Sequence, residues 1–221
     1  MTKTKKFHFT AGKSSGEVSA ILMIPDNTEK LLVFAHGAGA GMMNSFMQKM
    51  SEQLASYGIA TFRYNFPYME NKKKSPDPKG IVLAAVRSAV VEARKKLPGV
   101  PLFAGGKSFG GRMTSTAESE NHLDDVRGIV FFGFPLHPPG KASDERAIHL
   151  YKVKVPMLFL QGTRDSLADL KLLRPVCNKL GKLAELYVIE GADHSFRVRG
   201  KKEDDVIIEL ALKVKDWSYL L

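Results

Sequence analysis

The sequence predicts an α/β fold, with a mostly parallel β-sheet that carries helices on both faces. Short apolar runs rich in β-branched and aromatic residues recur along the chain and mostly end at glycine, as buried strands do. Between them lie longer stretches that repeat apolar residues at helical spacing. We find no internal repeat, low-complexity tract or linker, so residues 1–221 are predicted to form a single domain.

The predicted elements follow one another in chain order. "KKFHFTA" and "EVSAILMIP", separated by a Gly/Ser-rich turn, predict an opening hairpin. The runs predicted to be buried strands are "LLVFAHG", "IATFRYNF", "PLFAGG", "GIVFFGF", "PMLFLQG" and "ELYVIEG". Amphipathic helices are predicted over residues 44–57, 81–96, 108–118, 170–180 and 204–220.

Composition limits the class of protein. A chain of 221 residues with 44% hydrophobic and 25% charged residues is long enough for one well-buried core. The N-terminus lacks the roughly 7–15 consecutive apolar residues of a signal peptide, and no stretch approaches the roughly 20 of a membrane span. We therefore expect a cytoplasmic protein with no membrane role. The single cysteine, Cys177, is predicted to be a packed helix residue.

The stretch "GGKSFGG" at residues 105–111 has two interpretations. Gly-Lys-Ser would close a phosphate-binding loop, but G-x-x-x-x-G-K-[ST] requires glycine where the chain has Pro101. The alternative is G-x-S-x-G, in which a buried strand ends at a tight turn that presents a nucleophilic serine at the start of a helix. "PLFAGG" supplies the strand, and Gly106 and Gly110 supply the small residues that the tight backbone requires. Ser108 is therefore the predicted nucleophile.

A serine hydroxyl is a weak nucleophile until a base removes its proton and an acid orients that base. After such a serine we expect the acid and then the histidine, each in a loop that follows a strand. "TRDSLAD" places Asp165 just after one predicted strand, and "EGADHSF" places His194 just after the next. Nearby, Asp169 is expected to cap the following helix and Asp193 to be a turn residue.

Acyl transfer also requires two hydrogen-bond donors for the oxyanion that develops on the attacked carbonyl. One is predicted to be the amide of Phe109, at the positive end of a helix. The other is predicted to be the amide of Ala38 in "HGAGAGMMN", where Gly37 and Gly39 let the backbone approach a ligand closely. His36 is expected to shape this loop rather than transfer a proton. The stretch "HGAGAGMMN" departs from the G-x-G-x-x-G fingerprint of dinucleotide-binding sites. We expect no cofactor and no metal.

The motifs "HGAGAG", "GGKSFGG", "GTRDSLAD" and "GADHSF", in this order, resemble those of a small α/β-hydrolase of the dienelactone-hydrolase-like type, in a branch of predicted hydrolases. The resemblance covers nearly the whole chain and implies the α/β-hydrolase fold, an eight-stranded sheet and a catalytic triad of Ser108, His194 and Asp165. Dienelactone hydrolase itself uses cysteine where this chain has Ser108, so its substrate does not transfer. About twenty residues separate "GIVFFGF" from "PMLFLQG", where larger relatives insert a cap domain. We therefore expect no cap domain and an open site.

The formal net charge is +10. Part of this excess lies in "NKKKSPDPKG" and "RVRGKK", which are predicted to lie on the same edge of the sheet as the triad. A basic rim there would attract an anionic substrate or partner, and the alternative is a solvated surface that keeps the protein soluble. Neither segment has interleaved aromatic residues or a recognisable binding module, which argues against nucleic-acid binding.

Three functions fit these observations. The favoured one is a serine hydrolase, of the carboxylesterase or thioesterase type, that cleaves a small acyl ester, thioester or lactone through an acyl-enzyme. The second is an acyltransferase that uses the same triad, and the third is a non-catalytic binding or scaffold module with a dormant site. The intact triad pattern argues against the third. The sequence determines neither the natural substrate nor the oligomeric state.

Overall fold

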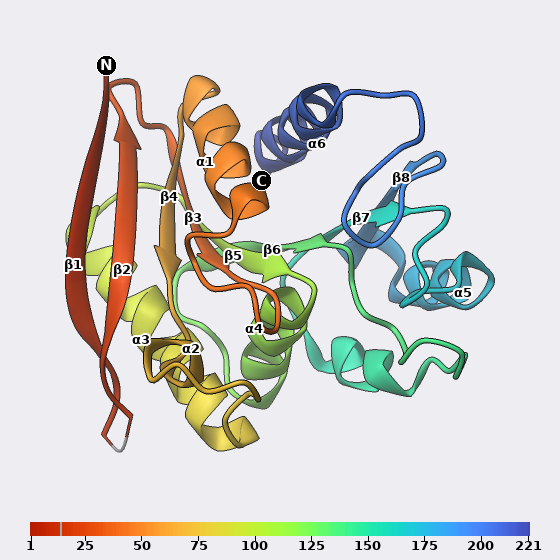
Figure 1. The fold of residues 1–221 in the computed structure, drawn as a ribbon, viewed down its shortest axis with the longest axis horizontal. Helices are drawn as coiled ribbons and strands as arrows, with labels where there is room; N and C mark the ends of the chain where they lie inside the picture. The colour runs from red at the N-terminus through yellow and green to blue at the C-terminus, as the bar shows by residue number, and fades with distance from the viewer. Residues whose placement is uncertain (14) are drawn as a thin grey trace.

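Eight strands form one sheet in the order β1-β2-β4-β3-β5-β6-β7-β8 (Figure 1). The computed structural model describes residues 1–13 and 15–221. The strands are β1 (Thr2–Gly12), β2 (Gly16–Pro25), β3 (Lys30–Ala35), β4 (Ile59–Tyr64), β5 (Leu102–Lys107), β6 (Val126–Phe132), β7 (Met157–Gly162) and β8 (Ala184–Ile189). β2 is antiparallel to both β1 and β4, and the remaining neighbours are parallel. The predicted opening hairpin and the mostly parallel sheet are confirmed, although the predicted hairpin turn includes Ser14, which lies outside the described residues.

The predicted helices also form, with ends that differ from the predicted ones by a few residues at most. They are α1 (Ser45–Ser56), α3 (Lys79–Lys96), α4 (Phe109–Glu120), α5 (Leu170–Leu180) and α6 (Glu203–Ser218). Side-chain caps start two of them, because Asn44 accepts from the Phe46 amide and Asp169 accepts from the Lys171 amide. The expected cap at Asp169 is thus confirmed. Short elements that the sequence did not predict are α2 (Pro67–Glu70) and the 3-10 helices η1 (Glu145–Lys152) and η2 (Gly181–Leu183).

The two faces of the sheet bury separate apolar cores, because successive strand residues point to opposite sides. In β6, Ile129 and Phe131 pack on the side of α3, α4 and α5, whereas Val130 and Phe132 pack on the side of α1 and α6. Figure 1 shows α1 and α6 above the sheet and α3 and α4 below it. The predicted arrangement of helices on both faces is confirmed. Cys177 on α5 is buried in the first of these cores, as expected.

The connection between β6 and β7 is the segment in which the sequence predicts no cap domain. Its residues, 133–156, are all described, and their only helix is η1. This segment forms no separate domain over the carboxyl ends of the strands. In the described part of the chain, no helix combines the length and apolar character needed to cross a membrane.

Candidate active site at the carboxyl ends of the parallel strands

Ser108 occupies a sharp turn between β5, which ends at Lys107, and α4, which begins at Phe109. Its φ of 50° and ψ of −115° are uncommon for a residue with a side chain. The turn requires close backbone contact on both sides. A Cβ atom on Gly106 would lie 2.4 Å from the Ala35 carbonyl oxygen, and one on Gly110 would lie 2.5 Å from the same oxygen. The two predicted glycines therefore lie where the strained turn has no room for a side chain.

Ser108, His194 and Asp165 lie in one hydrogen-bonded chain. The distance from Ser108 Oγ to His194 Nε2 is 2.8 Å, and that from His194 Nδ1 to Asp165 Oδ2 is 2.7 Å. An ionised carboxylate has no proton to donate, so Nδ1 carries the proton and Nε2 accepts from the serine hydroxyl. The three side chains come from the loops after β5, β7 and β8, which meet at one edge of the sheet.

The Asp165 side chain is enclosed, with 1% of its surface exposed, whereas that of His194 is 22% exposed. Two further donors orient the carboxylate. Gln161 Nε2 donates to Asp165 Oδ2 over 2.5 Å, and the Leu167 amide donates to Oδ1 over 2.8 Å. Gln161 is itself fixed, because its Oε1 accepts from the Phe134 amide over 2.9 Å. Sequence reasoning missed Gln161, and the available signal was a polar residue near the end of the otherwise apolar strand "PMLFLQG".

The loop that carries His194 is held from two sides. Asp193 Oδ1 accepts from the amides of Ser195 and Arg197, so the expected role of Asp193 as a turn residue is confirmed. From β5, Lys107 Nζ donates to the His194 carbonyl oxygen over 2.6 Å. Burial lowers the pKa of Lys107 to about 8. The residue just before Ser108 therefore fixes the backbone of the histidine, a contact that the sequence did not reveal.

The loop after β3 lies beside the serine. A Cβ atom on Gly37 would lie 3.8 Å from Ser108 Cβ. His36 shapes this loop as expected, because Nδ1 donates to the Gly37 carbonyl over 2.7 Å and Nε2 accepts from the Phe66 amide over 3.1 Å. The Gly39 amide donates to the hydroxyl of Tyr68, a residue of α2 that sequence reasoning missed.

The structure leaves both predicted oxyanion donors free. Ala38 is exposed in the loop after β3, and Phe109 is the first residue of α4. Within residues 1–13 and 15–221, neither amide N–H has an internal hydrogen-bond acceptor. Both amides thus remain available to a ligand near Ser108.

No metal-binding cluster is evident in the described residues. Among them, no three His, Cys, Asp or Glu side chains are grouped so that they could bind a metal ion. The polar groups at this edge of the sheet are instead arranged around one serine hydroxyl.

Comparison with known proteins agrees with this architecture. Residues 28–218 match the family model described as "Alpha/beta hydrolase domain". The chain belongs to the α/β-hydrolase domain family. Since the match spans most of the sheet and all three hydrogen-bonded residues, the family assignment applies to the domain that carries the site.

Solved α/β-hydrolases have similar folds at low sequence identity. Dienelactone hydrolase from Anabaena variabilis superposes with a TM-score of 0.74 at 19% identity, covering 97% of this chain and 96% of that one. An α/β serine hydrolase homologue from Coxiella burnetii gives 0.77 at 18% identity, with 96% of each chain covered. XC6422 from Xanthomonas campestris, described as an α/β serine hydrolase without lid, gives 0.76 at 19% identity, with 97% and 95% covered. These structures establish the shared dienelactone-hydrolase-like fold.

Curated relatives include a putative phosphoribosyl transferase of Mycobacterium tuberculosis, which is 25% identical over 204 residues. The alignment covers 90% of this α/β-hydrolase chain and 43% of the relative. The chain therefore spans less than half the length of the curated relatives that it matches.

The burial of His36 predicts a loss of stability in acid. Burial lowers its pKa from about 6.5 to about 4, so between these pH values the unfolded chain binds more protons than the folded chain. The free energy of unfolding should fall as the pH drops through this window, by about 3 kcal/mol for this residue. His36→Gln keeps one donor and one acceptor but has no such titration. Urea unfolding at pH 7 and pH 4 should show the stability difference between wild type and variant shrinking by about that amount; a difference independent of pH would contradict the assignment.

Proposed function

We propose that this protein is a serine hydrolase, of the carboxylesterase or thioesterase type, that cleaves a small acyl ester, thioester or lactone. One observation carries the proposal: the continuous hydrogen-bonded chain from Asp165 through His194 to Ser108. This arrangement activates a hydroxyl that is otherwise a weak nucleophile.

In the first half of the reaction, Ser108 Oγ attacks the substrate carbonyl while His194 Nε2 takes the hydroxyl proton. Asp165 stabilises the imidazolium that forms, and the hydrogen bonds that it accepts from Gln161 and from the Leu167 amide hold its carboxylate in place. The tetrahedral oxyanion accepts from the amides of Phe109 and Ala38. The intermediate then collapses, breaking the bond to the leaving group, which receives the proton from His194.

In the second half, water attacks the acyl-enzyme and His194 removes its proton. A second tetrahedral intermediate collapses, Ser108 recovers its proton and the carboxylic acid leaves. If an alcohol or thiol replaced this water, the same steps would give acyl transfer. The acceptor therefore distinguishes hydrolase from acyltransferase, and an open site favours water.

The comparisons support hydrolysis. Structural neighbours include esterase Est22, with a TM-score of 0.75, and Est1E from Butyrivibrio proteoclasticus, with 0.69. The name of the mycobacterial relative points instead to phosphoribosyl transfer. We follow the site rather than that name, because the matched segment is 43% of that protein and the rest has no counterpart in this chain.

The triad proposal predicts large kinetic losses when any one of the three residues is replaced. Ser108→Ala should lower kcat/KM for 4-nitrophenyl acetate by at least about 10³-fold, and Asp165→Asn by a similar order, because the three residues act as a unit. The matched control is Ser88→Ala on α3, which lies outside the site and should retain wild-type turnover. Substantial ester hydrolysis in Ser108→Ala would disprove the assignment.

The missing cap domain predicts a preference for short acyl chains. With only η1 between β6 and β7, the site should bury few methylenes, each worth about 0.8 kcal/mol when removed from water. On 4-nitrophenyl esters of two to twelve carbons, kcat/KM should therefore peak from acetyl to butyryl. No jump in rate should accompany micelle formation. A maximum at eight carbons or more would show that the segment 133–156 encloses a longer groove.

A further inference from the structure

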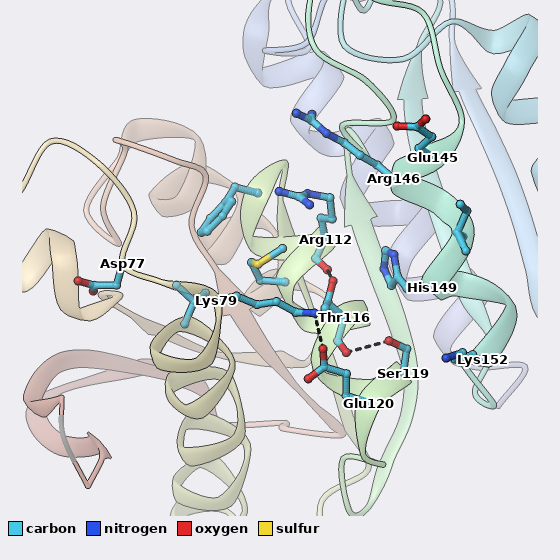
Figure 2. Close-up of a pocket in the computed structure, with 14 residues that line it drawn as sticks. Asp77, Lys79, Arg112, Thr116, Ser119, Glu120, Glu145, Arg146, His149 and Lys152 are labelled. Carbon is cyan, nitrogen blue, oxygen red and sulfur yellow. Dashed lines mark hydrogen bonds and ion pairs between the residues drawn. The ribbon is translucent and has the colours of Figure 1, made fainter.

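A cavity of about 850 Å³ opens beside the nucleophile turn, within the size range of small-molecule sites. Its walls come from the start of α3, one side of α4 and the length of η1 (Figure 2). Phe109, the residue after Ser108, is one of its lining residues, so the cavity lies next to the turn that carries Ser108. Its charged lining residues are Asp77, Lys79, Arg112, Glu120, Glu145, Arg146 and Lys152.

Arg112 is a half-buried cation without a counter-ion. Among the described residues, no carboxylate lies within 4 Å of its guanidinium, and its buried Nε has no hydrogen-bond partner. Burial lowers the pKa of Arg112, and the positive charge of Arg146 lowers it further. A guanidinium presents its donors in a planar fork that matches a carboxylate or a phosphate. Two such groups line one cavity, and among the described residues neither forms an ion pair with a protein carboxylate, so both remain available to an external anion.

The acidic residues of the cavity do not act as counter-ions for Arg112 or Arg146. Glu120 pairs with Lys79, and Asp77 pairs with Lys73 over 3.5 Å. Figure 2 shows the Lys79 to Glu120 contact at the far end of the cavity from Arg146. Glu145 is exposed and, within the described chain, forms no ion pair. Among the described residues, the cavity therefore has one carboxylate without an ion pair, Glu145, and three cations without one: Arg112, Arg146 and Lys152.

His149 gives the cationic end a fixed, uncharged wall. Its Nε2 lies 2.8 Å from the Ser115 hydroxyl, and burial lowers its pKa to about 4. It is therefore neutral at pH 7 and adds no charge of its own. The anion-attracting character of the cavity rests on the arginines.

The arginine and the nucleophile are linked through one turn of α4. The Arg112 amide donates to the Ser108 carbonyl over 3.1 Å, and four residues of helix rise about 6 Å. The Arg112 guanidinium carbon lies 6.0 Å from the centre of the Phe109 ring. A contact with an aromatic face satisfies none of the guanidinium donors in their plane. The guanidinium of Arg112 therefore lies beside the ring of the residue that follows Ser108.

We propose that Arg112 and Arg146 form a binding site for an anionic group of the substrate, a carboxylate or a phosphate, in the cavity next to Ser108. This inference rests on the proposed serine hydrolase function and specifies its substrate class as anionic esters. The site differs from the basic rim expected from the sequence, because neither arginine belongs to residues 71–80 or 197–202.

Matched esters test the proposal. One series carries the charge on the leaving group: phenyl butyrates with a meta carboxylate, a meta phosphate or a neutral meta carboxamide. The other carries it on the acyl group: 4-nitrophenyl adipate and its neutral terminal amide. The readout is the ratio of kcat/KM for the charged ester to that for its neutral partner, at constant ionic strength. We expect a ratio of about 10 or more in at least one series, and comparison of the carboxylate with the phosphate identifies the anion.

Substitution of each arginine then tests whether the preference for the charged ester depends on it. Arg112→Gln and Arg146→Gln should each lower the ratio by about 10-fold or more, as expected for the loss of a charge-assisted hydrogen bond. Arg174→Gln on α5 removes the same charge from an exposed position in another part of the surface and should leave the ratio unchanged. Charged-to-neutral ratios near 1 in both series, or ratios unaffected by Arg112→Gln and Arg146→Gln, would overturn the anion site while leaving the hydrolase function intact.

A binding measurement distinguishes failure of the anion site from failure of the hydrolase function. Inorganic phosphate and succinate, compared with chloride at equal ionic strength, should raise the melting temperature of the wild type and of Ser108→Ala, but not that of Arg112→Gln. If no ester is cleaved but this pattern appears, the anion site stands and the serine hydrolase function fails. If neither anion stabilises the wild type and no ester ratio exceeds 1, the anion site is refuted.

Discussion

The strained turn at Ser108 is the constraint on which the rest of the site depends. A non-glycine residue in this region of φ and ψ costs on the order of 1–3 kcal/mol and persists only where its surroundings enforce it. Here the Ala35 carbonyl lies against both Gly106 and Gly110, so β3, β5 and α4 come together without intervening side chains. The turn lifts the serine above the edge of the sheet, leaves the Phe109 amide free at the helix start and directs Arg112 into the neighbouring cavity.

The parallel sheet supplies the other groups, because the carboxyl ends of β5, β7 and β8 lie along one edge. The positions of these loops alone would not hold the side chains in hydrogen-bonding geometry. Asp165 is buried and receives bonds from Gln161 and Leu167, and Lys107 ties the His194 backbone to β5. These contacts hold the side chains in position within the folded chain, which is the preorganisation that the proposed mechanism requires.

Much of this could be predicted from the sequence, because the informative signals are local. Gly106 and Gly110 flank Ser108 at a fixed spacing, and Asp165 and His194 each follow a strand that is readable from its apolar run. The supporting contacts could not be predicted in the same way. The contact of Gln161 with Phe134 joins residues 27 positions apart, and that of Lys107 with His194 joins residues 87 positions apart. No local sequence pattern encodes contacts over such separations.

Charge was the least predictable property. From the sequence, the basic rim is expected in the lysine-rich segments 71–80 and 197–202. In the folded chain, however, Lys73, Lys79 and Lys201 form ion pairs with acidic residues. Arg112 and Arg146 are separated from those segments and become neighbours only when η1 packs against α4. The short η1 and α2 also escaped prediction, since elements of one or two turns carry little periodicity.

The central claim is that Ser108 is an activated nucleophile, and covalent labelling tests it most directly. A fluorophosphonate should modify the folded protein with a stoichiometry of about one, and peptide mapping should find the adduct on Ser108. Labelling should disappear in Ser108→Ala and slow by orders of magnitude in His194→Ala, because the hydroxyl then lacks its base. No adduct on the folded wild type, or an adduct on another residue with Ser108 unmodified, would contradict the account.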